Sequence, residues 1–233
     1  MLPRAVVFIL VAAARLSAAP GYDPAEVRGL LDKGRFTPAQ SQAALALLER
    51  ADRDGLPASM LVNRLREGIA RRADARAVLG VVEDRLQQLQ RADEVVRQCA
   101  ARGIAVRERE RALLTIADAF AQGVTPGDVL ALLPAAAESR RDVETVARAA
   151  ETLGRLARKG FPSKDTRDVV AAAAAAWPAE RLDDLVGLFL QADALRLSPD
   201  ETRELLLQEV RDKKKDPGGA SVLRREQDRR EGR

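Results

Sequence analysis

The chain contains no histidine and a single cysteine, Cys99, among its 233 residues. Zinc sites built from cysteine and histidine, and acid–base catalysis by an imidazole, are therefore excluded within the chain. One cysteine also cannot form an intrachain disulfide. Cys99 follows Val95 and Val96 on an expected helix, and a free cysteine behaves as a small apolar residue, so we predict that it is buried.

Aromatic residues make up only 3% of the chain, whereas hydrophobic residues make up 46%. The core must therefore consist of leucine, valine, isoleucine and alanine, and the scarcity of β-branched runs favours helix over strand. The phosphate-loop, dinucleotide-binding, nucleophile-elbow and calcium-loop motifs are absent. The sequence assigns no catalytic, cofactor-binding or metal-ligating residue.

The basic character of the chain belongs to its ends. The formal net charge is +4, but residues 1–18 carry +2 and residues 211–233 carry +4, so residues 19–210 carry −2. Phosphate binding needs a clustered basic surface, which disfavours nucleic acid as a partner of the folded body. We expect residues 213–233 to form a disordered charged tail, which could make weak contacts with anionic surfaces.

The first 18 residues have the order of features of a secretory signal. Met1–Arg4 is a short basic region, residues 5–14 (AVVFILVAAA) are apolar, and Leu16-Ser17-Ala18 offers small residues for cleavage. An N-terminal core helix is the alternative. The signal predicts an exported protein, periplasmic or extracellular. No later stretch has the roughly 18 apolar residues of a membrane span, so we expect no transmembrane segment in the mature chain.

A short phrase recurs along the chain: glycine, a large apolar residue, a capping residue and proline. It reads Gly21-Tyr22-Asp23-Pro24 and Gly123-Val124-Thr125-Pro126, with looser copies at Phe36-Thr37-Pro38 (after Gly34) and Leu197-Ser198-Pro199. Glycine in the left-handed conformation ends one helix, and Asp, Thr or Ser caps the next, which proline begins. The phrase predicts that helices follow one another through tight turns.

Apolar residues at helical spacing fill the segments between these turns. The longest candidate runs from about Asp74 to Ala101, and Ser198 with Glu201 forms the clearest capping box. Residues 19–212 are therefore predicted to be all-α. The spacing of the turns indicates an irregular array of stacked αα-hairpins, which is solenoid-like, and packed helical bundles are the alternative.

Stacked hairpins produce extended surfaces, so we expect a structural or protein-interaction module with a protein partner. The alternative is a cell-wall-active or other carboxylate-dependent enzyme. Glu138-Ser139 resembles the Glu-Ser pair of lytic transglycosylases, in which a glutamate is catalytic. That family's aromatic-rich sugar groove has no counterpart here. Two convergent, unpaired carboxylates in a concave site would favour the enzyme, and an apolar or charged groove would favour binding.

Overall fold

A computed structural model describes residues 21–215 and 221–232, and these residues form an all-α protein. An isolated β-bridge pairs Ala105 with Asp142, and no strand occurs in the described ranges. The helices are α1 (Pro24–Lys33), α2 (Pro38–Arg53), α3 (Ala58–Ala70), α4 (Ala75–Ala101), α5 (Arg109–Ala121), α6 (Pro126–Leu130), α7 (Leu133–Glu138), α8 (Val143–Arg158), α9 (Ser163–Ala176), the 3-10 helix η1 (Ala179–Asp183), α10 (Asp184–Ala194), α11 (Pro199–Lys215) and α12 (Val222–Arg230).

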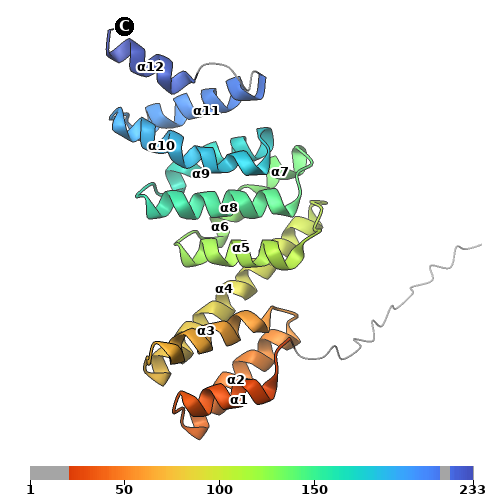
Figure 1. The fold of residues 1–233 in the computed structure, drawn as a ribbon. Helices are drawn as coiled ribbons and strands as arrows, with labels where there is room; N and C mark the ends of the chain where they lie inside the picture. The colour runs from red at the N-terminus through yellow and green to blue at the C-terminus, as the bar shows by residue number, and fades with distance from the viewer. Residues whose placement is uncertain (1–20, 216–220, 233) are drawn as a thin grey trace, which may run out of the picture.

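The helices form one elongated stack (Figure 1). Each helix packs mainly on helices close to it in the chain: α1 on α3, α2 and α3 on α4, α4 on α5, α5 on α8, α8 on α9, and α9 on α11. The long helix α4 connects the pair formed by α2 and α3 to α5. This arrangement matches the stacked array that the turn spacing indicated.

Three of the predicted helix caps are formed as capping boxes. Thr37 with Gln40 caps α2, Thr125 with Asp128 caps α6, and Ser198 with Glu201 caps α11. The cap of α1 differs: the Asp23 carboxylate accepts the N–H of Ala25, at 2.8 Å, but Glu26 forms an ion pair with Arg66 on α3 instead of closing a box. The ion pair with Arg66 therefore takes the Glu26 side chain away from the start of α1, where it could have closed a capping box.

The left-handed residue at each turn is not always the expected glycine. Gly123 has a φ of +94°, as predicted, but Gly34 is right-handed and the left-handed residue is Arg35, with a φ of +57°. Gly34 is needed for space, because a Cβ there would lie 2.8 Å from Ile69 Cγ1. Arginine also takes this conformation at Arg72, Arg140 and Arg196.

Helix α7 begins at Leu133, shortly after α6 ends at Leu130. Proline stands in the first turn of α7, where it leaves no hydrogen bond unmade. Glu138 is the last residue of α7 and Ser139 follows it as the C-cap, so this pair ends a helix.

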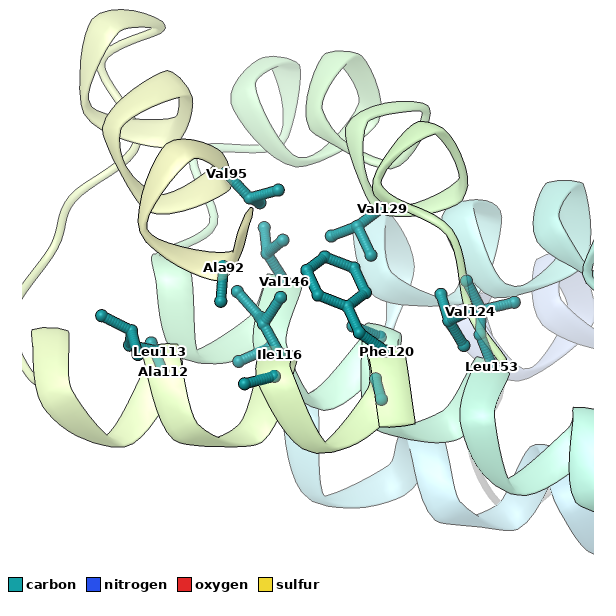
Figure 2. Packing of buried hydrophobic residues seen from close by; sticks show 14 of the residues in the cluster. Ala92, Val95, Ala112, Leu113, Ile116, Phe120, Val124, Val129, Val146 and Leu153 are labelled. Carbon is teal, nitrogen blue, oxygen red and sulfur yellow. The ribbon is translucent and has the colours of Figure 1, made fainter. Parts of the chain in front are cut away.

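The hydrophobic core is continuous along the stack. At its middle, residues of α4, α5, α6 and α8 meet, as Figure 2 shows for Val95, Phe120, Val129 and Val146. Cys99 on α4 is fully buried, which confirms the prediction, and burial raises the pKa of its thiol to about 11. The thiol therefore stays protonated at neutral pH and acts as an apolar core residue.

The C-terminal segment differs from the predicted disordered tail. Residues up to Lys215 continue α11, and Val222–Arg230 form α12, which packs on α10 and α11. Val222 and Leu223 are buried, and the carboxylate of Glu209 on α11 accepts hydrogen bonds from the Val222 N–H and the Ser221 hydroxyl. Glu209 thus satisfies the first turn of α12 from another helix, a stabilising contact that the tail's own composition does not reveal. The predicted signal peptide at residues 1–18 lies outside the described residues.

Candidate functional site

A charged groove lies between α5, α8 and η1, with a volume of about 450 Å³. We call it the central groove. Its lining consists of Glu108, Arg111, Ala112, Thr115, Glu144, Ala147, Arg148, Glu151, Ala179 and Glu180.

The residues that line the central groove have the same spacing in the sequence on both of its main helices. Positions 108, 111, 112 and 115 recur at helical spacing along α5 and the residue before it, and positions 144, 147, 148 and 151 repeat that spacing on α8. Ala112 and Ala147 are almost fully buried and form part of the lining. Because alanine has a short side chain, it leaves space between the two helices that the longer charged residues flank.

Most of the charges in the central groove are paired with each other. Arg111 forms an ion pair with Glu108 at 3.2 Å, and Arg148 forms one with Glu151 at 2.6 Å. Glu144 accepts the backbone N–H of Glu108 at 2.9 Å, which ties α8 to the start of α5. The four glutamates and two arginines give the lining a net charge of −2.

Two carboxylates keep free hydrogen-bonding capacity. Oε2 of Glu144 is buried and has no hydrogen-bond partner among the described residues. Glu180 on η1 is exposed and forms no ion pair with any residue that the structure describes. The paired arginines are already neutralised, so the uncompensated negative charge of the groove belongs to Glu144 and Glu180.

The arrangement is suited to binding a charged ligand. Glu108 and Glu151 are engaged with arginines, and one oxygen of Glu144 is held by a backbone N–H. Within residues 21–215 and 221–232, no group of three His, Cys, Asp or Glu residues is placed to hold a metal ion. The groove therefore carries paired charges together with two unpaired carboxylates, Glu144 and Glu180.

Sequence reasoning assigned no site residue and did not find the central groove. The one pair that it considered for catalysis, Glu138-Ser139, is exposed at the end of α7 and does not line the groove. The available signal was the presence of charged residues at helical spacing, at 108 and 111 on one helix and at 144, 148 and 151 on another. Charged residues at this spacing are also typical of ordinary solvated helix faces. Only the packing of α5 on α8 shows that these residues line a groove.

Comparison with known proteins gives no relative: no family model, curated protein or solved structure matches the chain. None of the described helices has the length and apolar character needed to cross a membrane. The fold and the groove therefore define the class of this protein on their own, as an all-α helical stack with a charged groove at its middle.

Proposed function

We propose that the protein is an exported interaction module whose central groove holds a basic segment of a protein partner. The observation that carries the proposal is the uncompensated negative charge of the groove. Lysine or arginine side chains of a partner would meet the exposed Glu180, and the Glu144 carboxylate beneath the surface adds negative potential there. Hydrogen bonds to charged groups contribute about 1.5–3 kcal/mol each.

The position of the groove also favours a binding role. The helices that carry most of its lining, α5 and α8, lie in the middle part of the elongated stack (Figure 1). Stacked helices of this kind present extended surfaces to partners. Export is supported by the order of basic, apolar and small residues at positions 1–18. Intact-mass analysis of protein from the native host should show the loss of 18 residues, and full-length protein in the cytoplasm would contradict export.

Titration of a fluorescently labelled peptide of alternating arginine and serine, followed by anisotropy, tests the groove. Binding should weaken strongly as salt rises from low to physiological strength, because surface charges are screened within about 8 Å. An acidic peptide of the same length should not bind. The double variant Glu144→Gln/Glu180→Gln should weaken binding at least about tenfold, as loss of roughly 1.4 kcal/mol implies.

The chain offers a matched control for this variant. Glu83 on α4 and Glu204 on α11 are exposed glutamates with no ion pair among the described residues. Glu83→Gln/Glu204→Gln removes the same charge outside the groove and should change affinity less than about twofold if only screened surface charge is lost. Equal weakening by the two double variants would show that the peptide senses the overall charge of the protein, and would contradict the proposal.

A further inference from the structure

A second polar cavity lies near the N-terminal end of the stack, between the C-terminal ends of α1 and α3 and the beginnings of α2 and α4. Its volume is about 700 Å³. We call it the anion cavity. The side chains that matter for its chemistry are Lys33, Arg35, Gln40, Arg72 and Asp74.

The cations of the anion cavity have no partner within the part of the chain that the structure describes. Lys33, Arg35 and Arg72 form no ion pair or side-chain hydrogen bond with any residue in the described ranges. The arginines of the central groove, Arg111 and Arg148, are by contrast each paired with a glutamate. Three cations that line one concavity repel each other, so an anion placed among them lowers the electrostatic energy of all three.

The acidic residue of the lining, Asp74, does not neutralise these cations. One of its carboxylate oxygens accepts the N–H groups of Arg76 and Ala77, at 2.9 and 3.3 Å, and so caps α4. The lining therefore carries a net charge of +2. The first turns of α2 and α4 and the last turns of α1 and α3 all border the cavity, so the helix dipoles oppose one another and the side chains set the potential there.

The two arginines occupy equivalent, fixed positions. Each follows the C-cap of its helix and is left-handed, with a φ of +57° at Arg35 and +55° at Arg72. The Arg35 N–H donates to Asp32 O at 3.1 Å, and the Arg72 N–H donates to Ile69 O at 2.9 Å. The same turn geometry therefore presents both guanidinium groups to the same cavity.

A further donor completes the lining. Oε1 of Gln40 accepts the N–H of Thr37 at 2.9 Å, which directs the carbonyl end of the amide toward the cap of α2. The NH₂ group of Gln40 has no partner among the described residues and stays available to a ligand. The anion cavity thus combines two guanidinium groups, one ammonium and one amide.

We propose that the anion cavity binds a phosphate monoester, with Lys33, Arg35, Arg72 and the Gln40 amide as donors. A dianionic phosphate matches the net charge of the lining, which a single carboxylate does not, and arginine forks bind phosphate oxygens in pairs. The volume far exceeds that of one phosphate, so the group attached to the ester also has room. Such an ester could be a soluble metabolite or a lipid headgroup.

Titration with glycerol phosphate at constant ionic strength, followed by amide chemical shifts in NMR spectra, tests the site. Shifts should concentrate at residues 33–40 and 69–76. The variant Arg35→Gly/Arg72→Gly should weaken binding at least tenfold. Because glycine accepts a positive φ without strain, this variant should fold at least as well as the wild type, and its melting temperature checks that it does.

The control is Arg140→Gly/Arg196→Gly, which removes the same charge from two other left-handed turns. It should change the affinity less than twofold. Equal weakening by both variants, or no shifts at residues 33–40 and 69–76, would overturn the proposal. Lys33→Gln alone should weaken binding severalfold without any change in a turn, and an unchanged affinity would overturn its role as a donor.

A second arm separates the two sources of the ester. Vesicles of phosphatidylcholine with one-fifth phosphatidic acid should sediment the protein, in a manner dependent on Arg35 and Arg72, if the cavity reaches a lipid headgroup. Binding of glycerol phosphate without sedimentation would assign a soluble ligand. Glu144→Gln/Glu180→Gln should leave phosphate binding unchanged, so this proposal and that of the central groove can fail separately.

Discussion

Replacing arginine with glycine at the left-handed turns should stabilise the protein, although it removes side chains. Arg140 and Arg196 are exposed, have φ values of +52° and +54°, and form no ion pair with the described residues. The left-handed region costs an L-residue about 1–2 kcal/mol. Glycine avoids this cost but loses about 0.5–1 kcal/mol through the greater freedom of the unfolded chain. The net gain should be about 0.5–1 kcal/mol at each turn.

The double variant Arg140→Gly/Arg196→Gly should therefore gain about 1–2 kcal/mol, since the two turns share no partner. In a chain of this size, that gain raises Tm by about 2–8 °C, measurable by circular dichroism. Arg140→Ala/Arg196→Ala separates the backbone from the side chain, because alanine keeps the strain, and it should bring no gain. If the alanine variant were as stable as the glycine variant, the backbone argument would be refuted.

The converse substitution tests the same reasoning where glycine is present. Gly123 has a φ of +94°, and a Cβ built there meets no atom within 4 Å. Gly123→Ala can therefore destabilise the protein only through its backbone conformation, by about 0.5–1 kcal/mol once the reduced freedom of the unfolded chain is counted. An unchanged Tm would show that the turn relaxes to another conformation at little cost.

Three other features give testable outcomes. Ser198→Ala should cost about 1 kcal/mol in urea unfolding, and its effect should be non-additive with that of Glu201→Ala because the two side chains bond reciprocally. Glu209→Ala should release α12 while the rest of the stack stays folded, seen as loss of amide protection at residues 222–230 only; global unfolding would contradict this. Hydrogen bonds from Arg229 and Arg230 lower the pKa of Glu226 to about 2. Its contribution to stability is therefore complete above its ordinary pKa, near 4.5, and is lost as the pH falls toward 2. The NMR shifts of Glu226 in the folded protein should titrate near pH 2, and titration near pH 4.5 would refute this role of the two arginines.

The fold was largely predictable because its determinants are local. Thr37, Thr125 and Ser198 begin helices through bonds to residues three positions away, and Gly123 ends one through its own φ. Such contacts lie within one window of sequence. These local contacts locate the ends of the helices along the sequence, and the spacing between the turns indicates that the helices stack in chain order.

The failures of prediction come from contacts between distant residues. Glu26, three residues after the cap of α1, pairs with Arg66, 40 positions away, and Glu209 on α11 caps α12 from another helix. The central groove depends on the packing of α5 on α8. This packing brings the backbone N–H of Glu108 to the Glu144 carboxylate, which accepts a hydrogen bond from it. Neither set of charged residues is distinctive alone, so the site could not be predicted from its residue types.

The most direct test of the central claim is photocrosslinking in the native host, with p-benzoylphenylalanine at Arg111 in the central groove or at Val81 on α4. Both side chains are more than half exposed, at 69% and 53%. Replacing Arg111 also removes a cation from the groove, so it should not repel a basic partner. We expect a crosslinked product of defined mass from position 111, lost in the Glu144→Gln/Glu180→Gln background, and none from position 81. Equal products from both positions, or a product at 111 that persists without the two carboxylates, would contradict the proposal that the central groove binds the partner.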